Sequence, residues 1–116
     1  MKLALVVLAL ALTGCATVED IEHSPATLNV ISGKNPQKYA DCFVGKIGDS
    51  REPPIIERHH DGLRLIVAQK LNSAPAAVVD VEKRSGGSTI KVYERLSNLP
   101  VRFRDVQESA EACISG

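Results

Sequence analysis

The chain has few aromatic residues and no excess of charge of either sign, and these absences exclude two classes of function. Aromatic residues make up 3% of the sequence and tryptophan is absent, so a sugar-binding platform of stacked rings is not expected. Lysine and arginine together number 14, as do aspartate and glutamate, and the two signs are interleaved. Nucleic-acid binding needs a concentrated cationic face, so we expect no nucleic acid as a partner.

The sequence also lacks the short motifs that mark common active sites. It contains no glycine-rich phosphate loop, no nucleophile elbow and no spaced set of metal ligands. Ser50, Arg51, Glu52 and Glu57 are interpreted as loop and edge charges rather than as a catalytic pair of carboxylates. We therefore expect no enzyme activity, no metal and no cofactor.

What the sequence does contain is an export signal in front of one ordinary domain. The 116 residues are 44% hydrophobic and 24% charged, as in a typical globular protein. Behind Met1-Lys2, the apolar run Leu3–Leu12 has about ten residues, too few to cross a bilayer ~30 Å thick as a helix. Such a run is typical of the hydrophobic region of a signal peptide.

The residues that follow, Leu12-Thr13-Gly14-Cys15, resemble the lipobox of bacterial lipoproteins, in which an aliphatic and two small residues precede an obligatory cysteine. The resemblance implies transfer of diacylglycerol to the Cys15 thiol, cleavage between Gly14 and Cys15, and acylation of the new amino group. Two or three acyl chains, at ~0.8 kcal/mol per buried methylene, would hold the protein on membrane lipid. The alternatives are an ordinary secretory signal with a coincidental cysteine, or a buried apolar helix.

The next positions predict the organisation of the exported part. Ala16 stands where aspartate would imply inner-membrane retention, so the resemblance implies sorting to the outer membrane, although Lys2 alone supplies the initial positive charge. We expect the domain to face the periplasm, with exposure at the cell surface as the alternative. Residues 15–32 have mixed charge, no sustained periodicity and a Ser24-Pro25 break, which predicts a flexible tether. We expect a signal peptide over 1–14, the lipidated cysteine and tether over 15–32, and one domain over 33–116.

Two segments of this domain have the spacing of amphipathic helices. Asn35 followed by Pro36 offers an N-cap and a proline at the first helical position, and Gly45 and Gly48 mark the end of that helix. Its predicted apolar face consists of Tyr39, Cys42, Phe43 and Ile47. The second apolar stripe, near the end of the chain, consists of Leu99, Phe103, Val106, Ala110 and Cys113, opposite Arg102, Asp105, Glu108 and Glu111.

Strand patterns fill the stretch between the two helices. After Pro53-Pro54, the run that begins at Ile55 predicts an edge strand, and Asp61-Gly62 predicts a hairpin turn into a central strand over Leu63–Ala68. Residues 76–83 and 89–95 predict two more strands. We therefore expect a two-layer α+β domain: a helix, an antiparallel meander of three or four strands, and a helix, with both helices on one sheet face.

The last two strands have a predicted register. A turn at Gly86-Gly87 sets Val81 opposite Val92, Glu82 opposite Lys91 and Asp80 opposite Tyr93. A slip of one residue would set apolar against charged side chains along the whole ladder. The glycine pair is interpreted as turn geometry rather than as a ligand contact.

The cysteines allow one further prediction. If Cys15 carries the lipid, Cys42 and Cys113 remain, and both lie on predicted apolar helix faces. Because an exported protein meets an oxidising environment, we expect a structural disulfide between them. A redox pair is the alternative, but catalytic disulfides usually join cysteines that are close in sequence.

His59-His60-Asp61 is the cluster that most resembles a metal site. Adjacent residues of a strand point to opposite faces, so we interpret this cluster as a solvated shoulder of a hairpin. The candidate interaction face is instead a charged surface of the sheet, comprising Arg64, Asp80, Glu82, Arg84, Lys91, Tyr93 and Arg95.

These features favour a non-enzymatic, lipid-anchored module that binds another envelope protein or supports an envelope assembly. A periplasmic inhibitor or immunity lipoprotein is a second hypothesis, because small disulfide-linked lipoproteins are often of this kind. A small-ligand carrier or an enzyme is the least favoured, since so small a domain can hardly enclose a deep polar pocket.

The first prediction concerns processing. The intact mass of the membrane-extracted protein is expected to show a chain that begins at Cys15 and carries diacylglycerol, and reduction is expected to add the mass of two hydrogen atoms. A native product that retains Met1, or that carries no fatty acid, would contradict the lipoprotein assignment.

Overall fold

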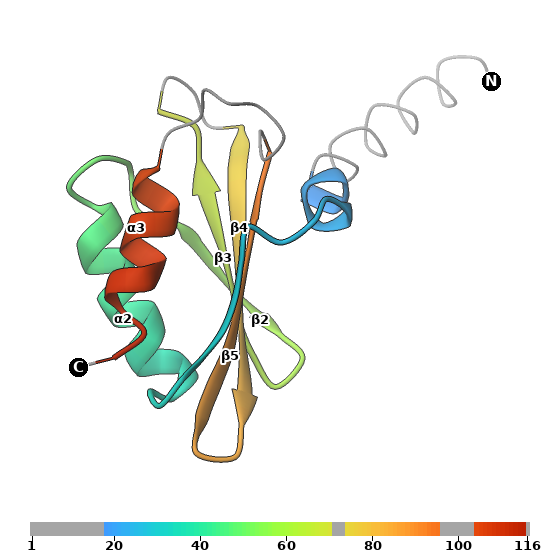
Figure 1. Cartoon of the computed structure of the whole chain (residues 1–116). Helices are drawn as coiled ribbons and strands as arrows, with labels where there is room; N and C mark the ends of the chain where they lie inside the picture. The colour runs from blue at the N-terminus through green and yellow to red at the C-terminus, as the bar shows by residue number, and fades with distance from the viewer. Residues whose placement is uncertain (1–17, 71–73, 96–103, 116) are drawn as a thin grey trace.

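The computed structural model describes residues 18–70, 74–95 and 104–115, and combines helices with an antiparallel sheet, as the sequence predicted (Figure 1). A short helical segment at residues 18–23 precedes the labelled elements. In chain order these are β1 (Leu28–Ser32), α2 (Pro36–Ile47), β2 (Ile55–His59), β3 (Gly62–Ala68), β4 (Pro75–Arg84), β5 (Gly87–Glu94) and α3 (Asp105–Ala112).

The sheet has five strands in the order β1-β5-β4-β3-β2, and all neighbours are antiparallel. The prediction of three or four strands was therefore wrong: β2 to β5 form an antiparallel meander, and β1, whose residues were expected in the tether, is the fifth strand. Leu28 and Val30 pack against the core, whereas Asn29 and Ile31 are exposed. This alternation is a strand pattern, but it covers few residues. The segment pairs with β5, a strand far away in the sequence, only when the chain has folded.

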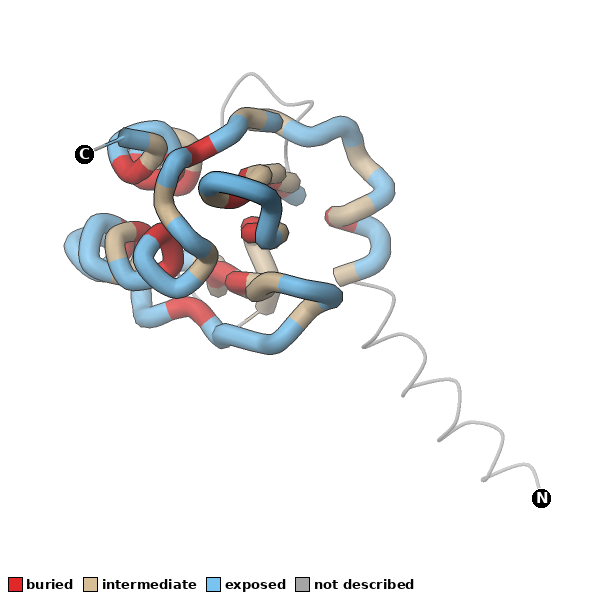
Figure 2. Tube along the Cα trace, turned by 90° about the horizontal axis from the view of Figure 1, so that it is seen from below, coloured by how far each residue is buried: buried red, intermediate tan, exposed pale blue. Residues whose placement is uncertain are grey.

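The hydrophobic core lies between the sheet and the two long helices. In Figure 1, α2 and α3 lie side by side to the left of the sheet, and the 18–23 segment lies to its right. Seen from below, the buried positions gather between the helices and the sheet (Figure 2). One cluster joins them, comprising Tyr39, Ala40, Phe43, Ile47, Leu65, Val67, Ala77, Val79, Val81, Ile90, Val92, Val106, Ala110 and Cys113.

The alternate strand residues form the opposite surface, which we call the outer face. It comprises Arg64, Ile66, Val78, Asp80, Glu82, Lys91 and Tyr93, together with their register neighbours on β1 and β2. Side chains on successive strand residues point to opposite sides of a sheet. The register therefore separates this surface from the core.

The start of α2 follows the sequence prediction. The Asn35 side chain accepts a hydrogen bond from the Lys38 backbone N–H at 2.9 Å, and Pro36 is the first helical residue. An N-cap of this kind satisfies a backbone donor that the helix itself leaves unpaired. The helix ends at Ile47, one residue before Gly48, so the glycine predicted to end it lies at its C-cap.

The β2–β3 turn lies one residue earlier than predicted. His59 pairs with Gly62, so the turn residues are His60 and Asp61, and His60 has a φ of 53°. Gly62 is needed for another reason: a Cβ atom there would collide with the Val81 carbonyl oxygen on β4. The glycine that resembled a turn residue thus permits the close approach of two strands.

The predicted register of β4 and β5 was wrong by two residues. Val81 pairs with Ile90 rather than Val92, and Asp80 pairs with Lys91. Because the shift is even, every side chain stays on its predicted face.

The turn between β4 and β5 explains this shift. Arg84 pairs with Gly87, so the turn residues are Ser85 and Gly86, and Gly86 has a φ of 81°. A Cβ atom at Gly87 would collide with the Ser32 carbonyl oxygen on β1. The second glycine therefore serves the approach of β1, which the sequence analysis did not anticipate.

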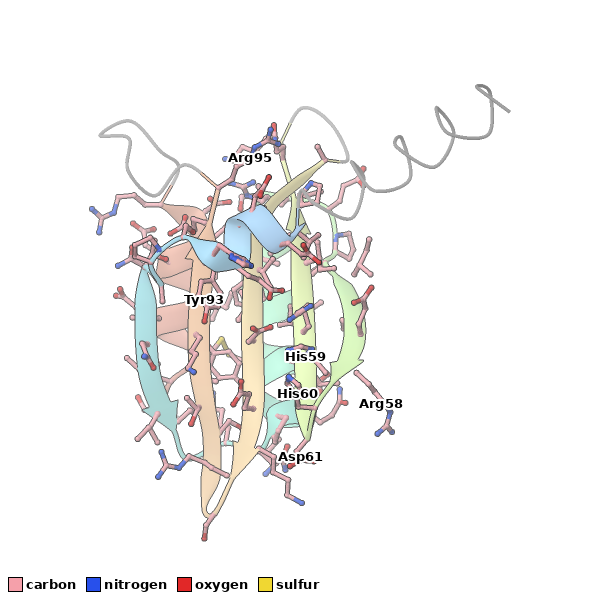
Figure 3. The ribbon with its side chains drawn as sticks, turned by 90° about the vertical axis from the view of Figure 1, so that its right-hand side faces the viewer. Arg58, His59, His60, Asp61, Tyr93 and Arg95 are labelled. Carbon is pink, nitrogen blue, oxygen red and sulfur yellow. A yellow bond between two sulfur atoms is a disulfide. The ribbon has the colours of Figure 1, made fainter. Side chains whose placement is uncertain are left out.

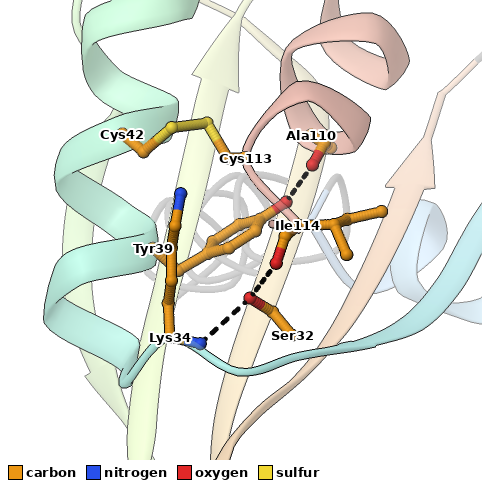
Figure 4. The surroundings of a disulfide bond; sticks show 7 residues. All are labelled: Ser32, Lys34, Tyr39, Cys42, Ala110, Cys113 and Ile114. Carbon is orange, nitrogen blue, oxygen red and sulfur yellow. Dashed lines mark hydrogen bonds between the residues drawn. A yellow bond between two sulfur atoms is a disulfide. The ribbon is translucent and has the colours of Figure 1, made fainter. Parts of the chain in front are cut away.

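The C-terminal helix α3 is fastened to the rest of the domain at several points (Figure 4). The predicted disulfide between Cys42 and Cys113 is confirmed. The Tyr39 hydroxyl donates to the Ala110 carbonyl oxygen at 2.6 Å, and the Ser32 hydroxyl donates to the Ile114 carbonyl oxygen at 2.6 Å. Burial raises the pKa of Tyr39, which keeps this hydroxyl protonated as a donor.

Part of the predicted C-terminal stripe is also observed. Val106, Ala110 and Cys113 are buried, as predicted. The remaining stripe residues, Leu99 and Phe103, lie outside the described residues, as does Arg102.

The disulfide is expected to contribute a large share of the stability. It joins residues 71 apart in the sequence, and removing such a link is expected to lower the free energy of unfolding by about 4 kcal/mol. Urea unfolding of the Cys42→Ala, Cys113→Ala double variant measures this change. The control is the wild-type protein under reducing conditions, which should unfold at the same urea midpoint as the double variant. If both unfold at the midpoint of the oxidised wild-type protein, the prediction is contradicted.

Candidate functional site

The register gathers the predicted interaction residues on one surface. Arg64, Asp80 and Lys91 lie side by side on β3, β4 and β5. Alternation along β4 and β5 places Glu82, Arg84 and Tyr93 on the same outer face, whereas Arg95 follows the end of β5. In exposure they differ: Asp80 is buried, Arg84 and Arg95 are exposed, and the other four are intermediate.

Arg64 is the centre of this surface. Its guanidinium contacts the Asp80 carboxylate at 3.1 Å, the Glu22 carboxylate at 2.7 Å and the His59 ring nitrogen Nε2 at 2.7 Å. The Arg64 and Asp80 side chains are 16% and 8% exposed. A buried charge must be compensated by partners, so these contacts make Arg64 part of a structural cluster as well as of the surface.

His59 has a defined role in this cluster. Arginine is a donor and has no acceptor, so Nε2 of His59 is the acceptor in this contact. The His60 ring lies beside the His59 ring with a centroid distance of 4.1 Å (Figure 3). Among the described residues, no group of three or more histidines, cysteines or carboxylates is placed to hold a metal ion.

The helical segment at residues 18–23 lies across the outer face, which the sequence analysis did not predict (Figure 3). Ile21 is 2% exposed, and Val78, an outer-face residue of β4, is fully buried. Glu22 reaches Arg64, and the Ser24 hydroxyl closes the segment by donating to the Ile21 carbonyl oxygen. An isolated isoleucine beside charged residues gave too weak a periodicity to predict this contact.

The electrostatics around Tyr93 reflect the same arrangement. Burial raises the pKa of its hydroxyl, and the negative charges of Asp80, Glu22 and Glu82 raise it further, against a smaller opposite effect of Arg64. The phenol therefore stays protonated and can donate a hydrogen bond. Tyr93 is therefore a half-buried hydrogen-bond donor beside the ion pairs of Arg64.

A second polar cluster fastens α3. Arg51 donates to both oxygens of Asp105 at 2.7 and 2.9 Å and to the Ala68 carbonyl oxygen at 2.9 Å, and the Ser50 hydroxyl donates to Asp105 at 2.7 Å. The sequence analysis interpreted Ser50 and Arg51 as loop charges. They instead make a bidentate ion pair with a helix 54 residues away in the sequence.

These clusters account for most of the residues that had suggested chemistry. Glu52 and Glu57 are exposed and lie on the loop and on the edge strand, as expected.

No helix in the described part of the chain is long and apolar enough to span a membrane. No family model, curated protein or solved structure matches the sequence or the fold.

Asp105 is expected to make stability depend on pH. Burial alone would raise its pKa, but hydrogen bonds from Arg51 and Ser50, with the positive charges of Arg51 and Lys70, lower the pKa to about 2. The stabilisation is therefore complete above the unfolded pKa of about 4 and is lost as the pH falls through about 2. At pH 7, Asp105→Asn should reduce the free energy of unfolding by about 1 to 2 kcal/mol.

Urea unfolding at pH 7 and at pH 2 measures this contribution. The matched control is Glu108→Gln on the same helix, because the Glu108 side chain is 70% exposed and lies 3.9 Å from Arg104. Equal losses for the two variants, or a loss for Asp105→Asn that persists unchanged at pH 2, would contradict the assignment.

Proposed function

We propose that this protein is a non-enzymatic, lipid-anchored module of the bacterial envelope, which binds another envelope protein through the outer face of its sheet. The anchor is the acylated Cys15 that the lipobox resemblance implies, and the location is the periplasmic side of the outer membrane. The proposal takes both long helices to cover one face of the sheet, so that the outer face is the side available to a partner.

The observation that carries the proposal is that six of the seven predicted residues share one face of the sheet. On β4 and β5, Arg84 is exposed and Glu82, Lys91 and Tyr93 are half-buried, and Arg95 is exposed directly after β5. A surface with both charge signs and a tyrosine resembles the polar rim of a protein interface. Acylation would add to affinity by confining the domain to the membrane where its partner lies.

A periplasmic inhibitor or immunity lipoprotein is the second candidate, and it would use the same face. The two differ in what the partner does: an assembly partner keeps its activity when bound, whereas a toxin or lytic enzyme loses it. A carrier or enzyme is the third. It receives less support, because the clusters around Arg64 and Asp105 are occupied by contacts within the chain.

Photo-crosslinking in intact cells tests the proposal. A crosslinking residue at Arg84 or Arg95 is expected to give one covalent product of defined mass with an envelope protein. The Cys15→Ser change is expected to reduce this product strongly, because the chain then lacks its lipid.

The matched controls are Lys38 and Asp41, which are exposed on α2. These positions should give no such product. Equal crosslinking from α2 and from the outer face, or none from the outer face, would contradict the proposed surface.

A further inference from the structure

The contacts of the 18–23 segment with the domain are few. Ile21 is its one fully buried residue, and Glu22 makes its ion pair with Arg64 at 2.7 Å, while Glu19, Asp20 and His23 are exposed. From Thr27 onward the chain is held differently, since the Thr27 backbone N–H donates to the Val92 carbonyl oxygen at 2.7 Å and begins the β1 ladder. Residues 18–23 therefore contact the domain independently of the β1 ladder.

We propose that residues 18–23 are a clasp, which docks on the outer face through Ile21 and Glu22 and opens while the rest of the domain stays folded. Segments with few buried apolar contacts open locally far more often than a core does. Ile21 is the buried apolar side chain of the clasp and Glu22 supplies its ion pair, whereas β4 is held by two neighbouring strands and the core.

Opening exposes part of the proposed interaction face. The docked clasp supplies the Glu22 carboxylate to Arg64, and Val78 on the same outer face is fully buried while the clasp is docked. When the clasp opens, the apolar Val78 side chain becomes exposed. The Arg64 guanidinium also loses its Glu22 partner and can bind another acceptor. The partner surface that fits them carries an aliphatic side chain beside a carboxylate, as the clasp itself does.

Opening also changes how far the domain reaches from its anchor, a consequence that rests on the proposed acylation of Cys15. With the clasp docked, the three steps from Cys15 to Val18 span at most about 11 Å. With the clasp open, the twelve steps from Cys15 to Thr27 span at most about 43 Å. The clasp thus holds the domain beside the membrane and, when open, both frees its binding surface and extends its reach.

Native-state hydrogen exchange on the membrane-extracted, full processed chain in detergent micelles tests the clasp. The amides of Glu22, His23 and Ser24 report on it, and those of Val79 to Val81 in β4 report on the core. The clasp amides are expected to exchange at least about tenfold faster than the core amides, with little dependence on low concentrations of urea. Exchange of both sets with the same rate and the same urea dependence would overturn the proposal.

A charge reversal supplies the specific test. Glu22→Arg places a like charge against Arg64 and is expected to speed exchange at His23 and Ser24 about tenfold or more, with β4 unchanged. The matched control is Glu19→Arg, on an exposed position of the same segment, which should leave the clasp rates unchanged. An equal effect of both variants, or an effect of Glu22→Arg on β4 as well, would overturn the proposal.

The intact mass of the same sample reports acylation separately. A clasp that opens on a chain without lipid would disprove the anchor and leave the clasp standing. A lipidated chain whose clasp opens only with global unfolding would support the anchor and disprove the clasp.

Discussion

The domain depends on the covalent link between α2 and α3. The helix α3 has eight residues, no side-chain bond at its N-cap and no basic residue in its last turn, so it would be marginal by itself. The disulfide at Cys113 fixes its end against α2, and the Asp105 ion pair with Arg51 fixes its start. Held at both ends, α3 can bring Val106 and Ala110 into the core, which completes the layer over the sheet.

The outer face, which we propose as the binding surface, also contains a cluster of contacts within the chain. Arg64 is satisfied by three side chains from different parts of the chain, and two of them, His59 and Asp80, belong to the sheet. The third, Glu22, belongs to the segment next to the proposed lipid anchor. A change in this contact would therefore alter both the exposed surface and the position of the domain, which links the proposed anchor to the proposed binding face.

Much of the fold was predictable from local sequence. The N-cap at Asn35, the alternation in β3, β4 and β5 and the pairing of Cys42 with Cys113 depend on residue type and spacing, and the structure has all three. The errors concern β1 and the turns. Their causes are contacts between distant strands, such as Gly62 against β4 and Gly87 against β1, which short-range patterns do not contain.

The candidate site divides in the same way. Local sequence is enough to assign residues of β4 and β5 to the outer face, because side-chain alternation is a local property and survives a register shift of two residues. The contacts of Arg64 with Glu22 and His59, and of Arg51 with Asp105, form only when the chain has folded. Ion pairs between segments many residues apart depend on how the chain folds back on itself. The sequence pattern of charged residues does not predict which of them will pair.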